Sequence, residues 1–438
     1  MAKICRPIAE YKEIIASSNF NFEEGTEYKP PKVTMKRFIH LFREVEDTRL
    51  SGMVEYPLHE VLLIAFLAVL ANASSWYDME RFGKRYKKWL KKFLKLENGI
   101  PSHDTFRRVF GLVNPEHLQH ATVNFLFTNM QSIKKSLKLK DDGMKQICID
   151  GKEENGTGRK YDTNEKIRNL QTLHVYDASH GICLFSELID KKTNEIPAAQ
   201  AVIPLLQLKN TVVTFDALHT QKETIKLIVK GAGDYVGALK GNQSTLEGFA
   251  KESFTAATKS MIKKGAKNYY ETLEKAHNQV ETRRFYLAKA KQKIEGLEEW
   301  QKLRNFICYE KYTCNVVTGK ENTETRYYIT SLRDIELCAD AVRGHWSIEN
   351  QLHWHLDYSF GEDDDTTMDQ NAFSNLSLIN KTALSLCKLA QPLYKDGSIR
   401  GIRKMFGWSM EDTLSEILNA FDESTLRKAL ENAQSSKK

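Results

Sequence analysis

Paired cysteines, long apolar runs and the usual nucleophile or nucleotide motifs are all missing from this sequence. Its seven cysteines are scattered and form no CxxC pair, which argues against both a disulfide framework and a thiolate zinc site. The longest apolar run, Val61 to Leu70, is about half of what is needed to cross a bilayer, and the N-terminus has no signal-type apolar stretch. A GxSxG elbow, a Cys/His signature and a P-loop are also absent. We therefore expect a cytoplasmic protein that needs no side-chain nucleophile and contacts no membrane.

The composition that remains is that of a globular, moderately basic protein. The 438 residues are 41% hydrophobic and 10% aromatic, which predicts buried cores in two or three folding units. The formal charge is +7, and Lys84 to Lys95 reads KRYKKWLKKFLK. Such a stripe suits a DNA backbone, and a solvated helix face above an apolar one explains it equally well. The candidate DNA contacts in the stripe are Lys87, Lys88, Lys91 and Lys92.

The order of the expected elements changes at about residue 145. Residues 1–130 predict an all-α leading domain, with helices over 58–70, 76–96 and 104–113. Three strand-like runs follow, QICID, LQTLHVYDA and GICLFSELI, and then a helix over 198–207, a strand TVVTFDA, a helix over 220–229 and a strand DYVGALK. This order, β-β-β-α-β-α-β, is the opening of the ribonuclease H-like α/β fold, whose parallel strands need helical crossovers.

The second half of the chain predicts an interruption of that core. A lysine-rich helical start is followed by the runs QVETRRFYLA, LRNFICYEKY and ETRYYITS, which alternate as β-strands do. The chain then returns to helix before an acidic loop. The predicted organisation is a helical domain for binding DNA ends over 1–130, a core in two parts over 145–243 and 332–392, an inserted β-rich subdomain over 244–331 and a C-terminal helical tail over 393–438.

Two aspartates close strand-like runs, and a glutamate lies in the helical return. Asp150 follows QICI, Asp216 follows TVVTF, and Glu349 lies within HWSIENQLHW. Ligands collect at the carboxyl ends of strands in an α/β sheet, and Mg²⁺ prefers carboxylate oxygens while keeping several waters. A single strand-end aspartate is more often a turn residue or a helix cap. The three acids in this order of elements favour a metal site.

A pair of carboxylate-held ions would account for the missing nucleophile. Two ions roughly 3.5 to 4 Å apart can activate a water or a 3′-hydroxyl and stabilise the leaving oxygen, so one site could serve both hydrolysis and strand transfer. Two other metal sites are weaker. His353 and His355 point in different directions on one helix, and the acidic loop Glu362–Asp365 lacks the ligand spacing of an EF-hand.

Several longer motifs carry a family resemblance. They are CIDGK (Cys148–Lys152), TFDALHTQKE (Thr214–Glu223), DYVGALKGNQ (Asp234–Gln243) and RGHWSIENQLHWHLDYSFGEDD (Arg343–Asp364), with GIPSHDTFRRVF (Gly99–Phe110) in the leading segment. Together they resemble the DDE transposases of bacterial insertion sequences, and more closely the branch that includes the H-repeat-associated proteins. The resemblance spans nearly the whole chain. It implies a ribonuclease H-like core with an inserted β-subdomain, a Mg²⁺ or Mn²⁺ pair on Asp150, Asp216 and Glu349, and transposition of double-stranded DNA through a synaptic homodimer.

The chain departs from the wider superfamily around the glutamate. That superfamily carries Tyr, Arg and Lys at positions that here are Val342, His345 and Leu356. His345 is expected to replace the arginine as a phosphate contact, and nothing replaces the lysine. Trp346 either stacks on a displaced base or packs in the core. Further expected DNA contacts, by position or by likeness to the family's basic insert motif, are Lys152, Lys240 and Arg283.

Two other functions fit the same residues. A nuclease with this core would cut DNA without joining it, because hydrolysis and transfer share one metal site. A silent relic that only binds DNA would fit the missing Arg and Lys, although the presence of all three acids argues against it.

Overall fold

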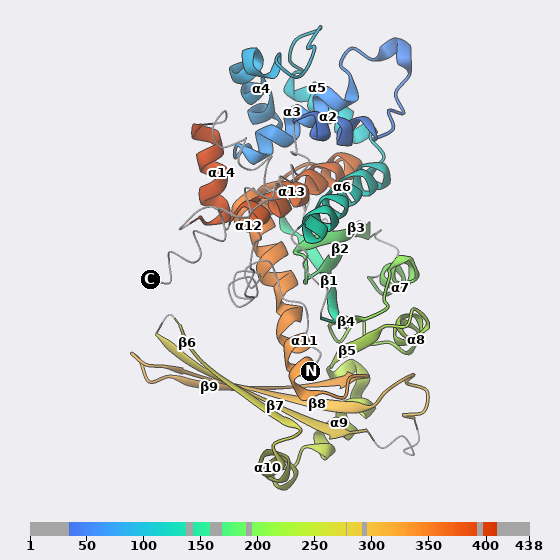
Figure 1. The fold of residues 1–438 in the computed structure, drawn as a ribbon, viewed down its shortest axis with the longest axis vertical. Coiled ribbons are helices and arrows are strands. Elements are labelled where there is room, and N and C mark those ends of the chain that lie inside the picture. Colours follow the sequence, from blue (N-terminus) through green and yellow to red (C-terminus); the bar gives the residue numbers. More distant parts are fainter. Residues whose placement is uncertain are drawn as a thin grey trace, which may run out of the picture.

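The computed structural model describes residues 35–136, 143–157, 169–189, 195–276, 278–290, 296–391 and 397–409. Helices gather at one end of the molecule, a twisted sheet runs through its middle, and a ribbon of long strands forms the other end (Figure 1). The first part of the predicted leading domain and most of the predicted C-terminal tail lie outside the described residues. Within the described ranges, no helix combines the length and apolar character that crossing a bilayer requires.

The leading segment is helical, as its apolar spacing predicts. Its helices are α2 (Met35–Arg43), α3 (Leu58–Leu70), α4 (Trp76–Leu90), α5 (His103–Leu112) and α6 (Pro115–Ser136). The hydroxyl of Ser102 accepts a hydrogen bond from the backbone N–H of Thr105 and so caps α5. The predicted helix over 76–96 is too long, because α4 ends at Leu90 and a turn follows.

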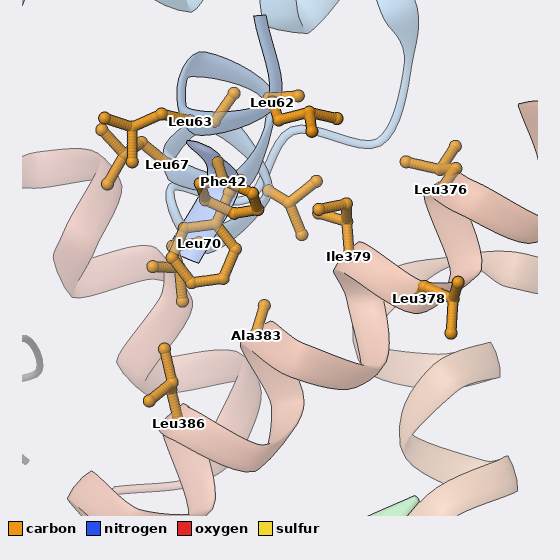
Figure 2. Close-up of a cluster of buried hydrophobic side chains, with 14 of the residues drawn as sticks. Phe42, Leu62, Leu63, Leu67, Leu70, Leu376, Leu378, Ile379, Ala383 and Leu386 are labelled. Atoms are coloured by element: carbon orange, nitrogen blue, oxygen red, sulfur yellow. The ribbon is translucent and has the colours of Figure 1, made fainter. Parts of the chain in front are cut away.

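Helix α3 is apolar all round because it is buried on every side. Twelve of its thirteen residues are buried, which is typical of a core helix. Much later in the chain, α13 (Gln370–Ala390) packs against α3, α5 and α6. Figure 2 shows Ile379 of α13 pointing toward Phe42 and the leucines of α3. The second part of the chain therefore closes the core of the leading helices.

A single sheet carries all nine strands, in the order β3-β2-β1-β4-β5-β9-β8-β7-β6. The first five strands are β1 (Lys145–Glu154), β2 (Leu170–Asp177), β3 (Ile182–Ile189), β4 (Thr211–Phe215) and β5 (Asp234–Leu239). β1, β2 and β3 form an antiparallel meander, whereas β4 and β5 run parallel to β1. The crossovers contain α7 (Glu195–Val202) and α8 (Lys222–Lys230). The predicted element order is confirmed over this part of the chain.

The strands of residues 244–331 extend the same sheet. Helices α9 (Ser244–Ser253) and α10 (Ala256–Gly265) lead into β6 (Tyr269–Ala276), β7 (Gln279–Lys289), β8 (Asn305–Asn315) and β9 (Glu321–Thr330). β9 then pairs antiparallel with β5. The predicted β-rich segment is therefore continuous with the central sheet, and the long strands project beyond it (Figure 1).

The two faces of the central strands are covered by different helices. One face packs on α7 and α8 through alternate residues such as Ile147 and Ile149. The other face is covered by one long helical run made of α11 (Ile335–Ser347), a π-helix η5 (Ile348–His353) and α12 (Trp354–Phe360). Because side chains alternate along a strand, residues 146, 148, 150 and 152 of β1 share the face toward this run. The final described helix, α14 (Ile399–Trp408), packs beside α12 and α13.

Candidate active site

Asp150 and Asp216 lie on neighbouring parallel strands at the same level. Ile149 of β1 is paired with Phe215 of β4, and each aspartate is the next residue along its strand. Neighbouring strands run about 4.8 Å apart, so the pairing places the two carboxylates side by side. One oxygen of Asp216 accepts the backbone N–H of His219 at 3.1 Å. One oxygen of Asp150 accepts the backbone N–H of Gly151 at 3.0 Å.

The expectation that Asp150 ends its strand is wrong. β1 continues to Glu154, because β2 pairs with it as far as that residue on the opposite edge. Only the parallel pairing with β4 stops at Ile149. Asp150 therefore stands at the point where β1 loses one neighbouring strand and keeps the other.

Glu349 comes from the helical run that covers this face. It is the second residue of η5, a six-residue π-helix inserted between α11 and α12. π-turns are uncommon and occur frequently at functional sites, because the extra residue re-aims the side chains around it. The sequence predicts a helix through Glu349 and does not show this change of winding.

Two of the three carboxyl groups, Asp150 and Glu349, have raised pKa values. Burial raises the pKa of Asp150 to about 7, and the negative charges of Asp216 and Glu349 add to the rise. Loss of surrounding water also raises the pKa of Glu349, while the cations Arg326 and Lys240 oppose it. A bound cation would favour the ionised form of both groups. As the side chains stand, no three metal-ligating groups among the described residues converge closely enough to enclose an ion.

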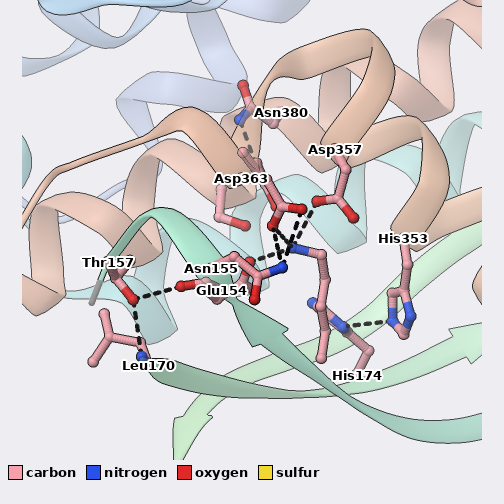
Figure 3. A network of polar contacts seen from close by, with 12 residues as sticks. Glu154, Asn155, Thr157, Leu170, His174, His353, Asp357, Asp363 and Asn380 are labelled. Carbon is pink, nitrogen blue, oxygen red and sulfur yellow. Dashed lines mark hydrogen bonds and ion pairs between the residues drawn. The ribbon is translucent and has the colours of Figure 1, made fainter. Parts of the chain in front are cut away.

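A pair of neutral histidines lies behind Asp150. His174 is the partner of Asp150 across β1 and β2, and its Nδ1 lies 3.0 Å from Nε2 of His353 (Figure 3). Nδ1 of His353 is 3.9 Å from the Asp150 carboxylate. Burial lowers the pKa of His353 to about 3 and that of His174 well below its ordinary value. His353 therefore presents either a lone pair or an uncharged N–H toward Asp150, depending on its tautomer.

A fourth acid, which the sequence reasoning missed, stands at the edge of the site. The carboxylate of Glu195, at the start of α7, lies where a Cβ on Gly151 would have to be. It is also 3.5 Å from Nε2 of the buried His219. A side chain at position 151 would make the carboxylate end of Glu195 turn aside.

The chain matches two family models, DDE_Tnp_1-associated over residues 39–126 and Transposase DDE domain over residues 141–386. The second match covers more than half of the chain and includes all three acids. This chain belongs to the transposase DDE domain family.

Its relatives include proteins of Escherichia coli strain K12. The putative protein YbfL is 30% identical over 374 residues, which cover 84% of this chain and 95% of that protein. The H repeat-associated putative transposase YhhI is 29% identical over the same share of each chain. Among solved structures, the piggyBac transposase synaptic complex with hairpin DNA covers 93% of this chain and 88% of that chain at 12% identity, with a TM-score of 0.40. That structural likeness is too distant to support an argument.

In this DDE-family chain, Lys152 ties β1 to the end of the glutamate helix. Its ammonium pairs with the carboxylate of Glu154, lies 2.8 Å from Asp357 in α12 and lies 3.8 Å from Asp363 in the acidic turn. Figure 3 shows the three carboxylates converging from their separate elements. Burial by itself would lower the pKa of Lys152, but the surrounding carboxylates, Glu362 first, raise it above its ordinary value. Lys152 is a permanent cation inside a buried acidic cluster.

The expectation that Lys152 contacts DNA does not fit this position. The side chain is only 5% exposed, and its partner Glu154 is fully buried. Its ammonium is enclosed by protein carboxylates and cannot reach a phosphate without leaving them uncompensated. The physical role that this geometry supports is to hold α12, and with it Glu349, against β1.

Other side chains on the same face of β1 meet earlier turns of the helical run. Nε2 of Gln146 donates to the backbone carbonyl of Ala341 at 2.8 Å, and the thiol of Cys148 donates to the carbonyl of Gly344 at 3.5 Å. From the other side, the ammonium of Lys388 in α13 donates to the carbonyl of Gln351 within the π-helix. Bonds from β1 and α13 thus hold the helical run that carries Glu349 at several successive turns.

His345 is not a cation in this structure. Its Nδ1 is 3.0 Å from the Thr214 hydroxyl, and burial lowers its pKa to about 4. A neutral, inward-facing imidazole is a poor replacement for a phosphate-binding arginine. The expectation for His345 therefore does not fit its surroundings.

Arg326 is a cation near the glutamate that sequence reasoning missed. It comes from β9, and its guanidinium lies 4.5 Å from the centre of the Trp346 ring. Trp346 is half-buried and helps to line a cavity of about 270 Å³ between α11 and the long strands, together with Arg283, Lys311 and Arg343. Arg283 is already paired with Glu274 and Glu281. The cavity is therefore basic, with its charge partly balanced.

The remaining expected DNA contacts are exposed. Lys240 follows β5 at the surface, and its charge reaches Glu349. Lys87 and Lys88 lie in the last turn of α4, and Lys91 and Lys92 lie in the turn that follows. All four are exposed, whereas Trp89 and Leu90 between them are buried. The predicted basic stripe is thus a solvent-facing surface above an apolar face.

Proposed function

We propose that this protein is a transposase that cleaves DNA at the ends of an insertion sequence and joins those ends to target DNA. The observation that carries the proposal is that the charges of Asp216 and Glu349 act on Asp150 in a member of the transposase DDE domain family. These acids come from two parallel strands and a helix far apart in sequence. Their mutual repulsion is what a divalent cation would relieve.

The strand arrangement supports a ribonuclease H-like core. An antiparallel β3-β2-β1 meander joined to parallel β4 and β5 through α7 and α8 is the arrangement that the sequence predicts. In this proposal residues 244–331 are an insert that lengthens the core sheet by four strands before α11 returns to cover the catalytic face.

The donors at the site fit Mg²⁺ or Mn²⁺. All three acids supply hard oxygen ligands, and the raised pKa of Asp150 shows that its charge lacks compensation from the protein. Asp150, Asp216 and Glu349 would hold two ions, which supply activation of an attacking hydroxyl and stabilisation of a leaving oxygen. His353 keeps the Asp150 carboxylate in place without competing as a cation, and Lys152 holds the helix that carries Glu349.

The cations around the acids would guide DNA to them. Lys240 and Arg326 face Glu349, and Arg283 with Trp346 lines the neighbouring basic cavity. The lysines of the α4 stripe are the candidates for recognition of transposon ends, since phosphate contacts from clustered lysines dominate affinity for DNA. Transposition of paired ends would bring two copies of this chain together in a synaptic homodimer.

Cleavage and joining of a labelled duplex that carries the element's own ends tests the proposal. The reactions contain Mg²⁺ or Mn²⁺ and compare wild type with Asp150→Ala and Glu349→Gln. Asp234→Ala is a matched control, because Asp234 begins β5 at the opposite end of the parallel strands and is paired with Lys302. We expect metal-dependent nicking and joining in wild type and the control, and neither in the two site variants.

Other outcomes would select other functions. Nicking without joining to a 3′-hydroxyl acceptor identifies a nuclease with the same core. Binding without any cleavage in wild type identifies a silent DNA-binding relic. Unchanged activity and metal dependence in Glu349→Gln would show that the glutamate is assigned wrongly.

A further inference from the structure

Helix α14 is anchored by a buried arginine. The guanidinium of Arg403 donates to the backbone carbonyl of Val69 at 2.8 Å and to that of Ser359 at the end of α12, and it lies 3.9 Å from the centre of the Phe360 ring. These bonds satisfy carbonyls at the ends of two helices, α3 and α12. α14 is therefore fixed firmly against the helix that follows Glu349.

The opposite face of α14 is cationic and aromatic. Arg400, Lys404 and Trp408 follow one another at four-residue spacing and are exposed, so they share one side of the helix. Within the described residues, neither Arg400 nor Lys404 forms an ion pair with a carboxylate. Trp408 is 78% exposed. Among the described residues, no carboxylate pairs with the two cations of this face.

A stack of rings continues this face onto α12. The rings of Trp354 and Tyr358 are stacked, with centroids 4.7 Å apart and planes at 22°. The guanidinium of Arg400 lies 5.0 Å from the centre of the Tyr358 ring. Trp354 and Tyr358 are 50% and 54% exposed, although large aromatic rings are normally buried. The order of the stack is indole, phenol and guanidinium, with part of the indole open to solvent.

We infer that Trp354, Tyr358, Arg400, Lys404 and Trp408 form a platform that binds an unpaired DNA strand. This inference rests on the proposed function, since it takes DNA as the substrate. Aromatic faces bind unpaired bases by stacking, and neighbouring cations bind the phosphates of the same strand. A duplex hides the faces of its bases except at its ends, so half-exposed aromatic rings beside cations favour single-stranded DNA over paired DNA.

The position of the platform agrees with this partner. Trp354 is five residues beyond Glu349 in the same helical run. In Figure 1, α14 and the outer ends of the long strands project to the same side of α11.

Binding of fluorescein-labelled oligo(dT) to the full chain tests the inference. Fluorescence anisotropy is measured in EDTA, with a duplex of the same length for comparison. Loss of one stacking partner should weaken binding of the single strand about 5- to 100-fold in Trp354→Ala, and Trp354→Phe should restore part of it. The double variant Arg400→Ala/Lys404→Ala should reduce the salt dependence by about 1.4 in the log–log slope, which corresponds to two phosphate contacts.

The control variant removes two positive charges at the same four-residue spacing from another helix. Lys222 and Lys226 of α8 are each more than half exposed and lie on the other face of the sheet. Lys222→Ala/Lys226→Ala should leave binding of the single strand unchanged. Equal losses in this control, or an unchanged affinity in Trp354→Ala, would overturn the inference.

Two further results would also overturn it. Equal weakening of duplex binding in Trp354→Ala would mean that the platform does not select unpaired DNA. If Trp354→Ala changed the molecular mass of the protein in solution but not its DNA affinity, this face would be a contact between protein chains. Because no cleavage takes place in EDTA, these results are independent of whether Asp150 supports nicking, and the proposed function can fail or stand separately.

Discussion

Replacing Lys152 by methionine should destabilise the protein, because Lys152 holds the helical run that carries Glu349 against β1. Methionine keeps most of the length and apolar surface of the side chain and removes its charge. Glu154, Asp357 and Asp363 then lose the cation that they share. Glu154 is fully buried, so solvent cannot take the place of the lysine. The loss of stability therefore arises mainly from the Glu154 carboxylate.

The size of the effect follows from this burial. Removing one partner of a buried ion pair typically costs about 3–5 kcal/mol, because an uncompensated charge remains. Asp357 and Asp363 are each about a third exposed, and solvent screens their contribution. We therefore expect a loss near the lower end, about 3 kcal/mol in the free energy of unfolding.

The loss should depend on pH in a defined direction. Burial, and then the charge of Glu362, raises the pKa of Glu154, while Lys152 opposes the rise. Without Lys152 that pKa rises further. A carboxyl whose pKa is raised by folding destabilises the folded state only when it ionises, so its penalty is absent below the ordinary pKa and grows as pH rises through the folded pKa. The variant should therefore lose less stability at about pH 5 than at about pH 8.

Urea unfolding at both pH values measures this prediction. Lys152→Arg, which keeps the charge, should retain most of the stability. Lys226→Met, at an exposed pair in α8, should change it by less than about 0.5 kcal/mol. Where the variant stays folded, the Mg²⁺ concentration that half-saturates nicking should rise, because Glu349 is less firmly placed. A Lys152→Met protein with wild-type stability at both pH values would refute the reasoning.

Three further substitutions test individual contacts. Asp150→Asn should raise the unfolding free energy by on the order of 4 kcal/mol at about pH 8 and not below about pH 4, because the rise of the pKa from 3.8 to about 7 makes the ionised carboxylate unfavourable when folded; no gain in a denaturant titration would contradict this. Gly151→Ala should cost less than about 1 kcal/mol, because only the movable carboxylate end of Glu195 stands in the way, and a larger loss in thermal unfolding would show that Glu195 is held in place. Gly344→Ala should push α11 away from Gln146 and slow nicking despite alanine's better helix propensity; equal rates in a nicking assay would count against it.

The element order was readable because it depends on local pattern. Runs such as TVVTF and DYVGAL have the β-branched content of buried strands, and they became β4 and β5. The apolar spacing of 58–70 and 104–113 likewise became α3 and α5, within a residue or so at each end. Each of these patterns lies within a single helix or strand, so it can be recognised without knowing any contact to a distant residue.

The expectations that do not fit the structure concern residues whose surroundings come from distant parts of the chain. Lys152 lies next to Asp150 in sequence and is expected at the DNA surface, yet Asp357 and Asp363 from about two hundred residues later enclose it. His345 is expected as a cation and is kept neutral by burial beside Thr214. Nothing in the local sequence around either residue carries this information.

The sequence by itself determined which residues alternate on a strand, where helices begin, and that three acids occur in the order typical of the family; their catalytic roles stay a prediction. Tertiary structure alone decided that the Asp150 face of β1 lies under the glutamate helix, that a π-turn re-aims Glu349, and that Arg326 from β9 supplies a nearby cation. Periodicity records which side chains share a face. It does not record which layer covers that face, because the covering helix is chosen by packing between segments far apart in the chain.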